Sequence, residues 1–291
     1  MHPITPPLQP ILPILLCCDM DRTLIPNGVQ PESPEARPRL RALCAHPQIH
    51  LVMVTGRHID LVLEAMTYWD LPHPDFIIGD VGTSVYIPDE RTNTWSIWPS
   101  WEAEIGPAWN GMTHADIIDL FADIAAITPQ GRDRQGVFKA SFFTDTAVNT
   151  EVLEAELTRR LWTLGIDARL VWSEDEAAGT GLLDVLPANA SKLHAIEFLS
   201  YQRGYTPDRT VFAGDSGNDL EVLGSHINAV LVANAPAQVR AQACAAVVAA
   251  GAEKSLYIAQ GGLFGMNGNY SAGVLEGLAH FLPETQPWMQ L

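Results

Sequence analysis

Two acidic side chains follow a short apolar segment near the start of the chain. Ile11 to Cys18 is predicted to form a buried strand, and Asp19-Met20-Asp21 comes directly after it. Carboxylates two residues apart at a strand end can take separate roles, one as a nucleophile and the other as a general acid and base. Such residues also end strands as ordinary turn residues or caps, and the pair alone leaves both interpretations open.

Groups suited to binding an anion follow two further predicted strands. Thr55-Gly56-Arg57 comes after Leu51 to Val54, where a hydroxyl and backbone N–H groups at a strand-to-helix turn suit phosphate oxygens. Lys192 follows the predicted strand Leu182–Leu186 and opens a predicted helix. Its ammonium can hold an attacking carboxylate and a phosphoryl group together as a point charge. Taken alone, Thr55 is better explained as a helix cap and Lys192 as a solvated side chain.

An acidic, glycine-containing turn follows the apolar segment Val211-Phe212-Ala213. Within it, Asp215 and Asp219 are four residues apart, which places them on one side of the helix predicted to start here. Hard oxygen ligands that converge on one point suit Mg²⁺, which also bridges to phosphate. The spacing lacks the alternate ligands and the terminal Glu of a calcium-binding EF-hand loop. The turn therefore indicates a magnesium site.

The elements that must position these groups alternate between strand and helix. Further buried strands are predicted at Phe76–Ile78, Thr210–Ala213 and Ala229–Val232, and helices at Ser33–Ala45 and Ile59–Tyr68. This alternation predicts an α/β fold, in which helices cover both faces of a parallel sheet. Ligands bind at the carboxyl edge of such a sheet, and all the polar segments above follow strands. We therefore expect them to converge.

The middle of the chain has a different pattern. Helices are predicted at His114–Ile127 and Thr150–Leu164, and strands at Val137–Phe143 and Ala168–Trp172, which together indicate an α+β insert. We predict a flexible N-terminal tail over 1–10, a core formed by 11–88 and 186–291, and an inserted cap over 89–185. Four tryptophans at the start of the cap are expected to pack between cap and core: Trp95, Trp98, Trp101 and Trp109.

Composition argues against several classes of partner. The 291 residues include 17 Lys+Arg and 34 Asp+Glu, so the formal net charge of −17 repels nucleic-acid backbones and anionic membranes. No segment approaches the roughly 20 apolar residues of a membrane span, and the first ten residues lack the basic residues of a signal peptide. The four cysteines have no metal-ligand spacing, and we expect reduced thiols in a cytoplasmic protein.

As a set, the polar segments resemble the four signature motifs of the haloacid dehalogenase-like (HAD) hydrolases. The matching residues are Asp19-x-Asp21-x-Thr23, Thr55, Lys192 and Gly214-Asp215-x-x-x-Asp219. The insert lies between Thr55 and Lys192, as in the type IIB subfamily. This resemblance implies a Rossmann-like parallel-sheet core with an inserted α+β cap of type C2B.

Several further stretches are similar to those of sucrose-phosphate phosphatases within that subfamily. They are Ile77–Thr83, Phe138–Phe143, Leu183–Pro187, Gly214–Asp219 and Ser271–Phe281. The resemblance implies a Mg²⁺-dependent phosphatase that hydrolyses a phosphorylated disaccharide or glycoside through an aspartyl-phosphate. Sucrose 6-phosphate is the first substrate expected, giving sucrose and phosphate. Alternatives are the phosphates of mannosylfructose, glucosylglycerol and mannosylglycerate, or a non-catalytic module that binds a sugar-phosphate synthase.

The resemblance also assigns roles to the core residues. Asp19 would be the nucleophile and Asp21 the general acid and base, while Thr55 and Lys192 would hold phosphoryl oxygens. Mg²⁺ would bind Asp19, the backbone carbonyl of Asp21, and Asp215, with Asp219 supporting these ligands or orienting Lys192. The expected partners are a small-molecule sugar phosphate and the cognate synthase.

Substrate-binding candidates lie in both predicted domains. In the core they are Thr55, Gly56, Arg57, Lys192 and Asn218. In the cap, Lys139 on a predicted strand is the first candidate, with Gln130 and Asp184 as further ones. Lys139 is equally explained as a solvated residue on the face of a strand.

Overall fold

The computed structural model describes residues 12–89, 91–92, 94–145, 147–175 and 179–291. The predicted tail, 1–10, lies outside the described residues. The chain divides into two compact units. Described residues up to Val52, with Trp69–Asp75 and Leu199–Leu291, form the first unit, and Met53–Tyr68 with Phe76–Phe198 form the second. The core and cap boundaries that we derived from the sequence stay a prediction.

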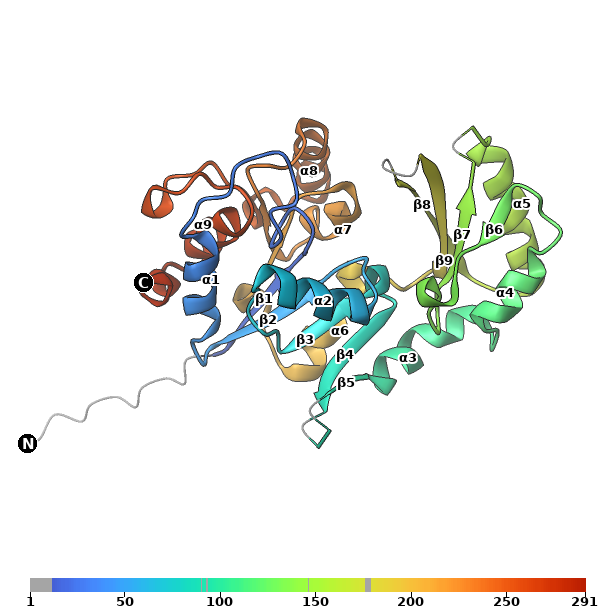
Figure 1. Cartoon of the computed structure of the whole chain (residues 1–291), viewed down its shortest axis with the longest axis horizontal. Helices are drawn as coiled ribbons and strands as arrows, with labels where there is room; N and C mark the ends of the chain where they lie inside the picture. Colours follow the sequence, from blue (N-terminus) through green and yellow to red (C-terminus); the bar gives the residue numbers. More distant parts are fainter. Residues whose placement is uncertain (1–11, 90, 93, 146, 176–178) are drawn as a thin grey trace, which may run out of the picture. The chain divides into compact units, whose positions relative to one another are not determined.

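Strands within the described residues form an eight-stranded sheet and a four-stranded sheet (Figure 1). The larger has the order β12-β11-β10-β1-β2-β3-β4-β5. Its strands are β1 (Ile14–Cys18), β2 (Ile49–Val54), β3 (Phe76–Gly79), β4 (Ser84–Asp89), β5 (Thr94–Ile97), β10 (Thr210–Gly214), β11 (Asn228–Leu231) and β12 (Leu256–Ile258). Strands β1, β10, β11 and β12 pair in parallel, whereas β4 is antiparallel to β3 and β5. The predicted α/β fold is confirmed.

The first unit is built on strands that are buried along their whole length. Every residue of β1 and β10 is buried, as expected for short apolar segments inside a sheet covered on both faces. The helices of this unit are α1 (Ala36–Cys44), α7 (Leu220–Leu223), α8 (Ala237–Ala250) and α9 (Ser271–Phe281). Helix α9 approaches β11 so closely that a Cβ on Gly277 would lie 2.2 Å from a methyl carbon of Val230.

The four-stranded sheet belongs to the second unit and is antiparallel throughout, in the order β6-β7-β9-β8. Its strands are β6 (Ile127–Pro129), β7 (Ala140–Thr144), β8 (Ala168–Asp175) and β9 (Thr180–Pro187). Helices α4 (His114–Leu120) and α5 (Thr150–Thr163) lie against one face (Figure 1), where Leu157 joins Phe142 and Leu183 in one apolar cluster. Because side chains alternate along a strand, Ser141 and Asp184 belong to the other face.

One predicted helix in this unit is wrong at its end. The helix expected over His114–Ile127 stops at Leu120, and Ile127 instead begins β6, opposite Thr144 of β7. Phe121 and Ile127 both enter the apolar cluster with Ile117. An apolar pattern that continues from a helix into a turn and a strand therefore looked like one longer helix.

Three further α-helices of the described residues lie wholly or mainly in the second unit. They are α2 (Ile59–Trp69), α3 (Pro99–Ile105) and α6 (Lys192–Arg203). Trp101 is fully buried, its indole N–H donates to the Gly82 carbonyl at 3.2 Å, and its ring centroid lies 5.1 Å from that of Phe198. Trp98 packs edge-on against the same Phe198. Trp98 and Trp101 therefore have a structural role, in packing against Phe198.

All four cysteines are described, and each is a free thiol. Burial raises the pKa of Cys44 to about 12 and the pKa values of Cys17 and Cys18 well above the ordinary range. Among the described helices, none combines the length and the apolar character that crossing a membrane requires.

Candidate active site

Asp19 and Asp215 follow two strands that are neighbours in the sheet. Strands β1 and β10 are parallel with Cys18 opposite Ala213, and the Asp19 N–H continues the ladder by donating to the Ala213 carbonyl at 2.9 Å. Both carboxylates therefore leave the sheet at the same edge. Asp19, Asp215 and Asp219 each present a carboxylate oxygen within 4.8 Å of the others. Their exposed fractions are only 5%, 1% and 0%.

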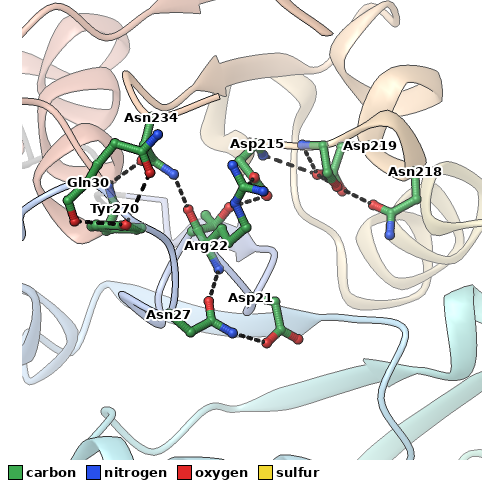
Figure 2. A network of polar contacts seen from close by, with 11 residues as sticks. Asp21, Arg22, Asn27, Gln30, Asp215, Asn218, Asp219, Asn234 and Tyr270 are labelled. Carbon is green, nitrogen blue, oxygen red and sulfur yellow. Dashed lines mark hydrogen bonds and ion pairs between the residues drawn. The ribbon is translucent and has the colours of Figure 1, made fainter. Parts of the chain in front are cut away.

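Asp219 fixes the turn that carries Asp215. Its Oδ2 accepts hydrogen bonds from the N–H groups of Asp215 and Ser216 and from the Ser216 hydroxyl, each at 3.1 Å (Figure 2). Asn218 is exposed, and its Oδ1 accepts from the same hydroxyl at 2.8 Å. Asp219 thus supports the turn on which Asp215 lies, four residues earlier in the chain.

The chemistry of this cluster fits a hard divalent cation. Three carboxylates that are buried and close together repel one another, and burial of a carboxylate is costly unless a positive charge compensates it. Their oxygen-only donor set is the kind that Mg²⁺ prefers. Asp19, Asp215 and Asp219 would hold such an ion by their side chains. The side chain of Asp21 lies outside this group of three.

Asp21 belongs to a loop held by side-chain amides (Figure 2). The Asn27 amide donates to Asp21 Oδ1 at 2.8 Å and accepts from the Arg22 N–H at 2.9 Å. Arg22 has a left-handed backbone, with φ at 60°, and its carbonyl accepts from Asn234 at 2.7 Å. Its side-chain Nε lies 3.3 Å from Asp215 Oδ2, so this loop contacts the acidic cluster directly.

Thr55 is held at the end of β2 in the second unit. Its N–H donates to the Ile78 carbonyl at 2.8 Å, and its hydroxyl accepts from the Arg57 N–H at 3.2 Å. Helix α2 begins only at Ile59, four residues later, so Thr55 does not cap it. The exposed Gly56 lies between these residues, which leaves its backbone accessible.

Lys192 begins α6 and is 2% exposed, which rules out the solvated interpretation. The preceding backbone packs against a glycine of the turn after β3. Gly82 has φ at +94°, and a Cβ there would lie 2.4 Å from the Ser191 carbonyl carbon and 2.7 Å from the Lys192 nitrogen. Only glycine permits this approach.

A buried ionic network joins the same turn to β7 and β9. Lys139 Nζ lies 3.6 Å from Asp80 Oδ1 and 3.8 Å from Asp184 Oδ2. Ser84 donates to Asp80 at 3.1 Å, and Ser141 donates to Asp184 at 2.6 Å. Burial raises the pKa of the Asp80 carboxyl, and the Lys139 ammonium opposes this shift. Lys139 is only 10% exposed in its side chain, so it is not a solvated strand residue.

A pocket of about 650 Å³ in the second unit includes Asp80 in its wall. Its polar and aromatic lining consists of His58, Asp80, Ser84, Tyr86, His114, Asp119, Gln130, Arg132 and Gln135. Burial, with Asp80 nearby, raises the pKa of Tyr86 to about 12, so its hydroxyl keeps its proton. Gln130 donates to the Phe142 carbonyl at 3.0 Å, which fixes its side chain. Such a lining offers many hydrogen bonds to a polyhydroxylated molecule.

Two residues of this arrangement were missed by sequence reasoning. Asn27 has no distinguishing signal, because a single Asn in a loop is common. Asp80 lies within the family-like stretch Ile77–Thr83, and its signal is an acidic residue between two glycines at the end of a predicted strand, which repeats the pattern of the other site segments.

Solved structures with a similar fold include a sucrose-phosphatase and a HAD subclass IIB sugar phosphatase. The sucrose-phosphatase of Synechocystis sp., solved with sucrose and phosphate, superposes with a TM-score of 0.70 at 23% identity, covering 93% of this chain and 98% of that one. A HAD subclass IIB sugar phosphatase has a TM-score of 0.52 at 15% identity, covering 79% and 91%. The fold is therefore that of the HAD-like hydrolases, as the motifs predicted.

Relatives in sequence extend this likeness. A protein of Nitrosococcus oceani described as a HAD-like hydrolase is 50% identical over 95% of this chain and 74% of its own length. The mannosylfructose-phosphate phosphatase of Agrobacterium fabrum is 31% identical over 76% of this chain and 83% of its own. Sucrose-phosphatase 2 of Nicotiana tabacum is 28% identical over 64% of this chain, which spans 41% of that relative.

The profile of the sucrose-6F-phosphate phosphohydrolase family matches residues 12–282. The chain belongs to this family. Our sequence-based predictions of a HAD-type resemblance and of a sugar-phosphate phosphatase are confirmed at this level.

Proposed function

We propose that the protein hydrolyses the phosphate ester of a phosphorylated disaccharide or glycoside, with sucrose 6-phosphate as its first substrate. The observation that carries the proposal is the buried cluster of Asp19, Asp215 and Asp219 at the ends of neighbouring parallel strands, in a chain of this family. A module that only binds a synthase has no need for three carboxylates that repel one another in a buried place.

In the first step, a carboxylate oxygen of Asp19 attacks phosphorus. The bond from phosphorus to the sugar oxygen breaks, and Asp21 gives its proton to that oxygen, so the sugar leaves as a neutral alcohol. Asp19 then carries the phosphoryl group as an acyl phosphate. The hydroxyl of Thr55, the backbone N–H of Gly56 and the ammonium of Lys192 hold the phosphoryl oxygens in this proposal.

In the second step, Asp21 removes a proton from water, and the water oxygen attacks phosphorus. The bond to Asp19 breaks, which releases inorganic phosphate and restores both carboxyl groups to their starting states. Bound Mg²⁺ supplies positive charge that stabilises the phosphoryl group, and the residues that would hold it are Asp19, Asp215, the backbone carbonyl of Asp21 and, in support, Asp219.

The polar pocket of the second unit is the proposed place for the sugar. Asp80, Gln130 and Arg132 line it, and the ammonium of Lys139 pairs with the Asp80 carboxylate. We therefore propose that Lys139, our first cap candidate, acts on the sugar through Asp80. Arg57 and Asn218 remain proposed contacts at the phosphoryl end.

A second sugar phosphate has specific support. The mannosylfructose-phosphate phosphatase of Agrobacterium fabrum is 31% identical, and this chain covers 83% of it. Mannosylfructose phosphate is accordingly the alternative substrate that we propose. A synthase partner is supported by a glucosylglycerol-phosphate synthase of Pseudomonas anguilliseptica, of which this chain matches 26% at 32% identity.

The proposal is tested by phosphate release from sucrose 6-phosphate by the wild type and by the Asp19→Asn variant. An amide is not a nucleophile, so we expect the variant to lose more than about a thousandfold in kcat. Asp70→Asn is the matched control, because Asp70 is 78% exposed and, with φ at 51°, has a backbone that Asn also tolerates. An Asp19→Asn enzyme with a tenth of the normal rate would exclude the aspartyl-phosphate.

A further inference from the structure

The Asn27 side chain forms a bridge between two neighbouring residues of the loop after β1 (Figure 2). Its Oδ1 accepts from the Arg22 N–H at 2.9 Å, and its Nδ2 donates to Asp21 Oδ1 at 2.8 Å. Both distances are typical of good hydrogen bonds. Asn27 is exposed, so this bridge and not burial in a core accounts for its place.

The orientation of the Asn27 amide is determined by its partners. A backbone N–H can only donate, so the group that faces Arg22 must be the amide oxygen. The NH₂ group consequently faces Asp21, and it can only donate. A flipped amide would place two donors together at Arg22 and two acceptors together whenever Asp21 is ionised.

The backbone on which this bridge depends is held at several points. The N–H groups of Leu24 and Ile25 donate to the Met20 carbonyl at 2.9 Å and 2.8 Å, which closes the turn. The Arg22 carbonyl accepts from Asn234, whose own oxygen accepts from the Tyr270 N–H at 2.8 Å. The left-handed Arg22 is thereby fixed, and its N–H stays directed at Asn27.

Of the two oxygens of a protonated carboxyl, the carbonyl oxygen is the better hydrogen-bond acceptor, and the other oxygen carries the acid proton. The proton of a neutral Asp21 therefore resides on Oδ2, and Oδ1 stays the carbonyl oxygen bonded to Asn27. We propose that Asn27 is a positioning residue that assigns proton transfer to Oδ2 of Asp21 and holds this carboxyl in its working orientation. This inference rests on the proposed role of Asp21 as general acid.

The Asn27→Asp variant separates the two halves of the bridge. A carboxylate at this position still accepts from the Arg22 N–H, but it cannot donate to Asp21. Asn27→Ala removes both halves. Since Asn27 is exposed, neither change opens a cavity in the core, and thermal unfolding checks that each variant is folded.

The measurement is kcat/KM for two phosphate monoesters, because this quantity reports the transfer of the phosphoryl group to Asp19. Sucrose 6-phosphate has an alcohol leaving group that needs the proton, whereas p-nitrophenyl phosphate has a leaving group that departs without it. We expect Asn27→Asp to lower kcat/KM about tenfold or more for sucrose 6-phosphate relative to the aryl ester. The added negative charge affects both anionic esters alike, so the ratio between them is the readout.

The Asp21→Asn variant distinguishes the failure of this inference from failure of the proposed function. If Asp21→Asn selectively slows the sugar phosphate and Asn27→Asp slows both esters equally or neither, Asn27 has no role in proton transfer and the inference is overturned. If Asp21→Asn itself shows no selectivity between the esters, the general-acid role of Asp21 in the proposed function is contradicted, and the inference about Asn27 is overturned with it. Selective loss in both variants supports the inference.

Discussion

The Lys139 ammonium lies 3.6 Å from the Asp80 carboxylate, and this contact joins two segments that are 59 positions apart in the numbering. Asp80 also holds the Arg57 carbonyl through its backbone N–H at 3.1 Å. A single acidic residue thus connects the strand-adjacent Lys139 with the turn that carries Thr55. Asp80 thus contacts the proposed phosphate-binding turn through its backbone and a residue of the predicted cap through its side chain.

Removal of the Lys139 charge leaves Asp80 in a buried place without this cation. We expect Lys139→Met to lower the free energy of unfolding by about 3 kcal/mol, because breaking one side of a buried pair is strongly destabilising. Chemical denaturation measures this. Lys254→Met is the matched control, since Lys254 is exposed. Equal effects of the two substitutions would contradict a structural role for the pair.

The same pair is expected to affect sugar binding. In Lys139→Ala, KM for sucrose 6-phosphate should rise more than KM for p-nitrophenyl phosphate, because we propose that the sugar binds in the pocket that Asp80 lines. Steady-state kinetics on both esters provide the comparison. A similar rise in both KM values would move the determinants of specificity away from this pocket.

Gly82 is expected to be intolerant of a side chain. Gly82→Ala forces a shift of the backbone at Ser191 and Lys192, because the new Cβ would lie 2.4 Å from the first of these residues. Gly111→Ala is the control: its φ of +80° carries a similar left-handed cost of about 1–2 kcal/mol, and no heavy atom lies within 4 Å of its Cβ position.

We expect Gly82→Ala to lose at least about 2 kcal/mol more stability than Gly111→Ala, together with most of its phosphatase activity as Lys192 moves. Denaturation and phosphate release test the two parts. If both alanine variants have the same stability and activity, the close packing at Gly82 does not position Lys192.

The ion pairs of Glu156, on α5, should make the free energy of unfolding depend on pH in the acid range. Hydrogen bonds from Arg159 and Arg160 lower its pKa to about 2, against an ordinary value of 4.5. A carboxyl whose pKa is lower in the folded state stabilises the fold at pH values above its unfolded-state pKa. This contribution disappears as the pH falls from about 4.5 to about 2. The wild type and Glu156→Gln should therefore differ in unfolding free energy at pH 6 and converge near pH 2. A difference that is constant across this range would contradict the assignment.

The acidic part of the site was predictable because its residues follow strands directly. Asp19 and Asp215 each come after a short apolar segment, and parallel strands bring their carboxyl ends to one edge of the sheet. Local spacing is therefore sufficient to expect their convergence. The same reasoning gave the α/β class, since buried strands read as continuous apolar runs.

Contacts between distant segments were not predictable in this way. The pairing of Lys139 with Asp80 joins segments 59 positions apart and depends on a left-handed turn at Asp80, neither of which leaves a local pattern. The end of the helix at Leu120 was not predictable either, because Phe121 and Ile127 are apolar residues of the same cluster and continue the apolar pattern beyond the helix.

The most direct test of the account is the rate of phosphate release from a panel of sugar phosphates, measured with Mg²⁺ and with EDTA. We expect Mg²⁺-dependent hydrolysis with kcat/KM for sucrose 6-phosphate about a hundredfold above the other sugar phosphates, which corresponds to about 2.7 kcal/mol of discrimination. A preference for mannosylfructose phosphate would keep the chemistry and change the substrate. Undiminished release in EDTA, or no release from any member of the panel, would contradict the central claim.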